Sequence, residues 1–140
     1  MAEVHEQAEL GASVEDVWKV VGDFGGFLEA LRVPADRVEL AGQGIGQTRK
    51  ILMGAEPTVE RLEERDDDAK RLAYSIVSGP FPVTGYLSTM QLSPIGDGRT
   101  KLDWSSTFDP AAGTSEEEAM RTVTAVYKAG IAGLQARFGT

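Results

Sequence analysis

Hydrophobic and polar residues alternate along several short segments of the chain, and in others the hydrophobic residues recur every three to four positions. Alternation predicts a half-exposed strand over residues 3–10. Six more segments predict strands near residues 36–42, 46–53, 58–65, 71–79, 83–93 and 99–108. Turn-forming residues such as Asp97-Gly98 separate these six segments. Consecutive strands joined by short turns indicate an antiparallel sheet.

Two short helices are predicted between the first strand and the second. Ser13 is followed three residues later by Asp16, a spacing typical of a helix N-terminus, and the helix that follows ends near Gly22. The segment FLEALRV at residues 27–33 predicts a second helix. This helix ends before Pro34, because a proline disfavours the helical conformation of the residue that precedes it.

The longest predicted element is a C-terminal helix of about 22–24 residues, for which Thr114 and Glu117 form the expected capping box. Its apolar residues step by three and four positions: Met120, Val123, Tyr127, Ile131, Leu134 and Phe138. Such a helix packs on the apolar face of the preceding sheet, so we predict an α+β fold forming one domain over residues 1–140. Within the helix, Gly130 and Gly133 are expected to leave room for a cavity.

Composition and charge narrow the classes of function. The chain carries 14 basic and 22 acidic side chains, a formal net charge of −8, which disfavours nucleic acid or an anionic membrane surface as the main partner. It has no cysteine and one histidine, which excludes disulfides, thiolate metal sites and histidine-rich metal sites. No apolar run approaches the ~20 residues of a membrane span, and no signal-peptide pattern is present. We expect a cytoplasmic protein that acts on a small organic molecule.

Two charged residues share predicted strand faces with hydrophobic residues. Arg49 lies on the same face as Ile51 and Met53, and Glu60 on the same face as Leu62. A hairpin centred between Gly54 and Ala55 would set Arg49 opposite Glu60, where cross-strand Cβ atoms are about 4.5–5.5 Å apart. One interpretation is a structural ion pair at the edge of the core. The other is that both line a cavity, where Arg49 holds a carbonyl or carboxylate and Glu60 moves a proton.

Aromatic residues leave similar alternatives open. Tyr86 and Tyr127 either donate hydrogen bonds to a ligand or find their partners within the core. Alternation does not settle whether Trp104 or Asp103 faces inward from their strand.

Four segments of the sequence together resemble the helix-grip proteins of the START/SRPBCC superfamily, and within it the polyketide cyclase/dehydrase-type branch. They are GQGIGQTRKILMG, ERLEERDDDAKRLAYSIVSG, PVTGYLSTMQL and YKAGIAGLQ. The resemblance covers nearly the whole chain and is most specific between Gly44 and Phe108. It implies a curved seven-stranded antiparallel sheet wrapped around the long C-terminal helix, enclosing a cavity for lipids, hormones or polyketide-like molecules.

Two plant members of the superfamily sharpen what the resemblance implies. The sequence is similar to the lachrymatory-factor synthase of onion. By this resemblance, Arg49 and Glu60 of the present chain match the catalytic pair of that enzyme, and Trp104 matches a tryptophan of its pocket. It is also similar to the abscisic-acid receptors, in which Glu60 and Tyr86 match ligand-lining positions. Leu28 stands where those receptors have an anchoring lysine, so this hormone is not the expected ligand.

These considerations predict a protein that binds a small hydrophobic or amphipathic, lipid- or polyketide-like molecule between sheet and helix. The alternative is a cyclase, dehydratase or isomerase that uses Arg49 and Glu60 for oxyanion stabilisation and proton transfer, with no metal or redox cofactor. A monomer or homodimer is expected. Beside this pair, the expected ligand-binding residues are Ile51, Met53, Leu62, Tyr74, Ile76, Tyr86, Ser88, Met90, Trp104 and Tyr127.

Overall fold

Seven antiparallel strands form one sheet in the computed structural model, which describes residues 1–140. The spatial order of the strands is β1-β7-β6-β5-β4-β3-β2, so the first strand pairs with the last and the others follow as consecutive hairpins. This confirms the predicted seven-stranded α+β fold. The strands are β1 (Ala2–Leu10), β2 (Val38–Ala41), β3 (Thr48–Ile51), β4 (Thr58–Asp66), β5 (Arg71–Ser78), β6 (Val83–Pro94) and β7 (Thr100–Pro110).

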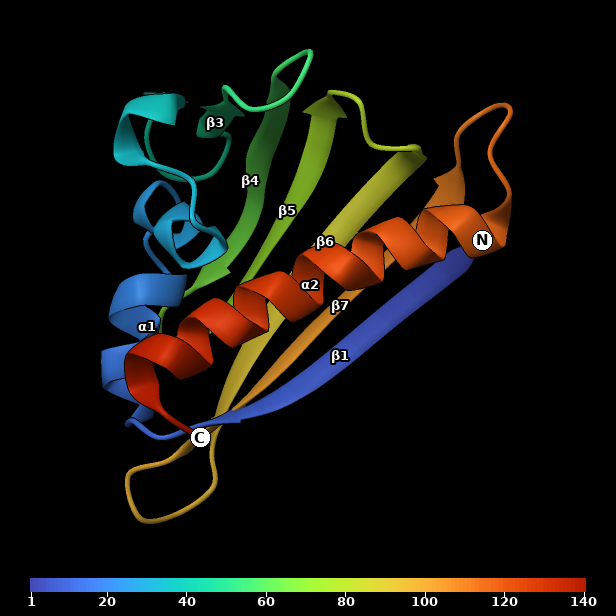
Figure 1. The fold of residues 1–140 in the computed structure, drawn as a ribbon. Helices are drawn as coiled ribbons and strands as arrows, with labels where there is room; N and C mark the ends of the chain where they lie inside the picture. Colours follow the sequence, from blue (N-terminus) through green and yellow to red (C-terminus); the bar gives the residue numbers. More distant parts are fainter.

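The long helix α2 (Glu116–Phe138) runs diagonally across one face of the curved sheet, as Figure 1 shows. The shorter helical segments gather near the C-terminal end of α2 (Figure 1). They are α1 (Val14–Val21) and the 3-10 segments η1 (Gly26–Leu31) and η2 (Ala35–Arg37). Buried side chains from the sheet, α1, η1 and α2 form one hydrophobic core. No helix of the chain has the length and apolar character needed to cross a membrane.

Strand β7 resolves the alternation that the sequence left open. Its burial alternates strictly, and Leu102, Trp104 and Phe108 are buried while Asp103 stays partly exposed. Trp104 is fully buried, with 0% of its surface exposed. The indole therefore faces α2, as the resemblance implied.

Helix ends follow the side chains that can satisfy free backbone N–H groups. Ser13 caps α1 as predicted, and its Oγ accepts a hydrogen bond from the N–H of Asp16 at 3.2 Å. The N-cap of α2 is Ser115 and not Thr114, because the Ser115 Oγ accepts from the N–H of Glu118 at 3.1 Å. The backbone N–H of Thr114 is instead bonded to the carbonyl of Ala111 in the preceding turn.

Three elements are shorter than predicted. Residues 35–37 form η2, so β2 begins at Val38, and β3 covers only Thr48–Ile51. Positive φ angles at Gly44 and Gly46 turn the chain before β3, a conformation that glycine adopts without strain. The second predicted helix is the 3-10 segment η1, which ends where Arg32 adopts a left-handed conformation with φ of 62°.

The two glycines of α2 do not open a cavity, contrary to the expectation from the sequence. A Cβ atom on Gly133 would lie 1.8 Å from the carbonyl oxygen of Ala30 in η1. A Cβ atom on Gly130 would lie 2.7 Å from the Trp104 ring. The missing side chains are thus used for close contact, and neither glycine lines the cavity described below.

Candidate ligand-binding cavity

A cavity of about 310 Å³ lies between the sheet and α2. Nineteen residues line it, of which 14 are hydrophobic. They come from η1 and the residues that follow it, from β3 to β7, from the loops after β3 and β5, and from α2. Its exposed rim contains Met53, Gly54 and Pro80, so the loops after β3 and β5 surround the opening. The Met53 side chain is the clearest marker of this rim, since the residue is 46% exposed.

Arg49 and Glu60 face each other across the β3–β4 hairpin, in the register that the sequence predicted. The Arg49 Nε donates to the Glu60 Oε1 at 2.7 Å, and the side chains are only 3% and 10% exposed. The guanidinium also donates from Nη1 to the carbonyl of Phe24 at 2.7 Å. Its carbon atom lies 4.0 Å from the centre of the Phe24 ring and 4.8 Å from that of Tyr74. Two hydrogen bonds and two aromatic faces thus hold this cation.

The buried ion pair leaves one donor and one acceptor unused. Nη2 of Arg49 and Oε2 of Glu60 form no hydrogen bond within the protein. Both side chains line the cavity, and they are the only charged residues on its wall. A bound molecule can therefore meet a hydrogen-bond donor beside a hydrogen-bond acceptor.

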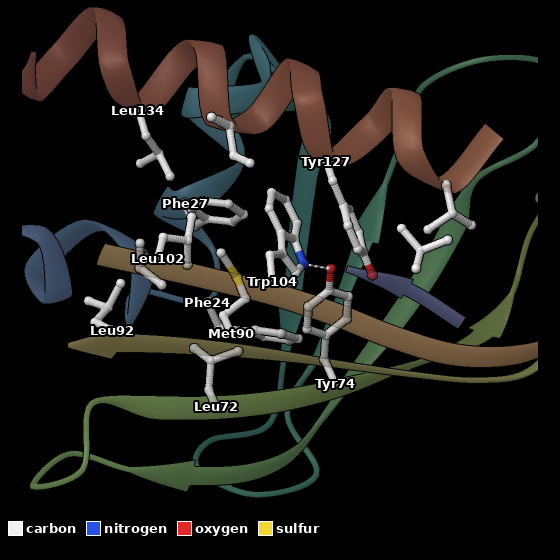
Figure 2. Close-up of a cluster of buried hydrophobic side chains, with 14 of the residues drawn as sticks. Phe24, Phe27, Leu72, Tyr74, Met90, Leu92, Leu102, Trp104, Tyr127 and Leu134 are labelled. Carbon is white, nitrogen blue, oxygen red and sulfur yellow. Dashed lines mark hydrogen bonds between the residues drawn. The ribbon is translucent and has the colours of Figure 1, made fainter. Parts of the chain in front are cut away.

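Five side chains joined by hydrogen bonds form a second polar feature, on β5, β6, β7 and α2. The hydroxyls of Tyr86 and Tyr127 are 2.5 Å apart, and the Tyr127 hydroxyl lies 2.8 Å from the Ser88 Oγ. The Trp104 Nε1 donates to the Ser88 Oγ at 3.0 Å. It also donates to the Tyr74 hydroxyl at 3.3 Å, the bond drawn in Figure 2. Because the Ser88 Oγ accepts from Trp104, its own proton is available to Tyr127.

The tyrosines of this cluster are held in the neutral form. Burial raises the pKa of Tyr74, and the nearby carboxylate of Glu60 raises it further. Burial also raises the pKa of Tyr86 well above its usual value, and that of Tyr127 likewise. All three hydroxyls are therefore hydrogen-bonding groups and carry no charge near neutral pH.

Aromatic packing fixes the wall beneath α2. The rings of Trp104 and Tyr127 stack with centroids 4.2 Å apart and an interplanar angle of 16°. Phe27 of η1 meets Trp104 edge-on at 5.6 Å. Figure 2 shows the Trp104 and Tyr127 rings side by side below the helix, with Tyr74 approaching from the sheet. Rigid rings on several elements give the cavity a defined shape.

A sequence model of the family described as polyketide cyclase / dehydrase and lipid transport matches residues 1–139. The chain belongs to this family. The match spans all the elements that build the cavity, and it agrees with the helix-grip resemblance seen in the sequence.

Solved structures of similar proteins support the membership. The protein XoxI from Bacillus cereus is 32% identical, with 99% of this chain and 96% of that chain covered and a TM-score of 0.88. A protein from Thermobifida fusca is 31% identical, with coverage of 99% and 94% and a TM-score of 0.85. ZhuI aromatase/cyclase from Streptomyces sp. R1128 shares the fold at 18% identity, with coverage of 96% and 92% and a TM-score of 0.74. No curated protein matches the sequence.

Most residues singled out from the sequence of this family member lie on the cavity wall. Besides the ion pair, they are Ile51, Met53, Tyr74, Ile76, Tyr86, Trp104 and Tyr127. Three other residues expected to bind the ligand, namely Leu62, Ser88 and Met90, do not line the cavity. Leu62 and Met90 are buried in packed core, where Leu62 lies opposite Tyr74 and Met90 opposite Trp104. Ser88 is fully buried behind the wall, occupied by its bonds to Trp104 and Tyr127.

Sequence reasoning missed about half of the wall. Residues of η1 and its exit, the loops after β3 and β5, the start of β4 and the first half of α2 complete the cavity. They are Phe27, Leu28, Leu31, Val33, Thr58, Pro80, Phe81, Val123 and Val126, together with Gly54. The apolar content of FLEALRV was the available signal for η1, whereas nothing local distinguishes Pro80 and Phe81 from ordinary turn residues.

Proposed function

We propose that this protein binds one compact hydrophobic or amphipathic organic molecule in the cavity. The observation that carries the proposal is a cavity of about 310 Å³ with 14 hydrophobic residues among 19 on its wall and only two charged ones. Ligand sites commonly combine an apolar wall with a small number of placed polar groups, at volumes of about 300–1,000 Å³. Membership of a polyketide cyclase/dehydrase and lipid transport family supports the same proposal.

The size of the cavity favours a compact ligand. Its volume of about 310 Å³ is at the lower end of the range of about 300–1,000 Å³ that is typical of ligand sites. The flat rings of Phe27, Trp104 and Tyr127 favour a planar partner.

Catalysis is the second candidate function, and the unused Oε2 of Glu60 favours it. In an isomerisation, Glu60 would remove a proton from the carbon beside a ligand carbonyl, and Arg49 would stabilise the oxyanion that forms. Return of the same proton to a different ligand atom would complete the reaction without a cofactor. Cyclisation and dehydration would use the same two roles.

Native mass spectrometry of protein purified from its own host tests whether a molecule is retained. We expect one ligand per chain, released on unfolding. Incubation of the identified molecule with wild type and with Glu60→Gln then separates the two functions. Conversion by wild type alone supports catalysis, whereas recovery of the unchanged molecule from both supports binding.

A titration tests occupancy of the cavity without knowledge of the natural ligand. The chain has two tryptophans, and Trp18→Phe leaves Trp104 on the cavity wall as the single indole reporter. We expect the neutral probe 2-acetylnaphthalene to quench Trp104 fluorescence saturably. Val126→Phe, which fills the cavity from α2, should weaken the binding, and Ala129→Phe on the exposed side of the helix should not. Equal effects of both variants would contradict the proposal.

A further inference from the structure

We propose that the cavity selects a neutral ligand over the carboxylate anion of the same shape, and that Glu60 sets this selectivity. The inference rests on the proposed function, because it concerns the ligand of the same cavity. It begins with charge: Arg49 and Glu60 are the only charged residues among the 19 that line the wall. The wall as a whole therefore carries no net charge.

The guanidinium is already neutralised before any ligand arrives. Its Nε bond to Glu60 is 2.7 Å long and its Nη1 bond to the Phe24 carbonyl is 2.7 Å long, with both groups buried. Aromatic rings of Phe24 and Tyr74 cover the cation at 4.0 and 4.8 Å. Only Nη2 remains without a hydrogen bond, and the Glu60 carboxylate is bonded to the Nε of the same guanidinium.

An anion is poorly stabilised at such a position. A ligand carboxylate at Nη2 would be attracted by Arg49 and repelled by Glu60 from a similar distance, so the two Coulomb energies largely cancel. It would nevertheless lose its hydration on entering an apolar wall, which is costly for an uncompensated charge. A neutral group with an acceptor beside a donor, such as a primary amide, can bond to both Nη2 and Oε2.

The other polar groups of the wall add hydrogen bonds but no charge. Tyr74, Tyr86 and Tyr127 are buried, and their pKa values are raised, so their hydroxyls stay protonated at neutral pH. Thr58, the remaining polar wall residue, is uncharged. Removing the charge of Glu60 would therefore leave Arg49 as a single uncompensated cation facing the ligand.

A matched pair of probes tests the inference. 2-Naphthamide and 2-naphthoate have nearly the same shape and differ in charge at neutral pH. For wild type we expect binding of the amide to be tighter by about tenfold or more. For Glu60→Gln we expect naphthoate affinity to rise about tenfold or more, so that the preference is reversed. Calorimetry or Trp104 quenching measures both affinities.

Two further variants assign the effect. Glu63→Gln changes the net charge equally but lies outside the cavity, bonded to Arg61 and Ser75, and it should retain the wild-type preference. The double variant Arg49→Gln/Glu60→Gln removes both charges and should lose the gain for naphthoate.

The outcomes distinguish failure of the charge selectivity from failure of the proposed function. Equal or tighter binding of naphthoate by wild type overturns the charge selectivity while leaving the proposed function intact. That comparison needs no variant, so it holds even if Glu60→Gln folds poorly. Unchanged naphthoate affinity in folded Glu60→Gln would also overturn the role of Glu60. Absence of binding of either probe to any variant would overturn the proposed function itself.

Discussion

A single buried ion pair dominates the electrostatics of this cavity at the scale of residues. Arg49 is 3% exposed and Glu60 8% exposed, so each charge has lost most of its hydration. Desolvation of a buried pair often cancels its Coulomb attraction, and the net contribution to stability is then small. The pair is better understood as a positioned polar group than as a source of stability. Removing only one partner should destabilise the protein, because a lone buried charge is strongly unfavourable.

We predict that Glu60→Leu lowers the free energy of unfolding by about 3–5 kcal/mol, since it strands the Arg49 guanidinium. The double variant Arg49→Met/Glu60→Leu should recover most of that loss, because neither charge remains. Urea denaturation followed by circular dichroism measures both. Additive losses in the double variant would show that the two side chains do not act as a pair.

At the scale of elements, the position of α2 depends on direct contact between its backbone and η1. Gly133 faces the Ala30 carbonyl so closely that a Cβ atom would lie 1.8 Å from that oxygen. In an exposed helix, alanine would be preferred to glycine by about 1 kcal/mol. Gly133 therefore lowers the intrinsic helix propensity of α2 but allows its backbone to pack closely against η1.

Gly133→Ala should accordingly destabilise the protein by about 1–3 kcal/mol, because the added methyl group overpacks the contact with η1. Thermal unfolding is a suitable measurement. Ala132→Gly, on the exposed side of the same turn, measures the effect of helix propensity on stability without a change in packing. Stabilisation by Gly133→Ala would mean that η1 can move away from the helix at little cost.

The whole molecule buries every tyrosine that it contains. The sequence has three, namely Tyr74, Tyr86 and Tyr127, and burial raises the pKa of each above the usual value of 10.0. Below pH 10 each hydroxyl is protonated in both the folded and the unfolded chain, so these groups contribute no pH dependence. Above it the unfolded chain releases protons that the folded chain retains, and stability falls.

We predict that the free energy of unfolding decreases above pH 10 by about 1.4 kcal/mol per pH unit for each buried tyrosine. Urea denaturation at a series of alkaline pH values measures this slope. Tyr127→Phe should reduce the tyrosine contribution by one third. Ionisation of all three tyrosines near pH 10 in a chain that is still folded would contradict the prediction.

Local sequence patterns predicted the architecture and the ion pair, but they did not predict how far the cavity extends along each strand. Arg49 and Glu60 could be paired because a tight hairpin fixes register. Alternation placed Leu62 and Met90 on the inward face correctly, yet it carries no information on how far along the strand the cavity extends. The meeting of Gly133 with Ala30 joins segments about a hundred residues apart, which no local periodicity can reveal. Phe81 lies in a loop without any repeat and was missed for the same reason.

The pairing of β1 with β7 has a consequence for synthesis on the ribosome. Leu10 of the first strand is buried opposite Thr100, and Ala2 opposite Phe108, so β1 has no partner until the last strand has been translated. Contacts so distant in sequence form slowly, and an unpaired apolar strand is prone to aggregation while it waits. The backbone and the apolar side chains of β1 therefore stay unpaired for most of translation. This is the stage at which we expect binding by a chaperone to protect the chain from aggregation.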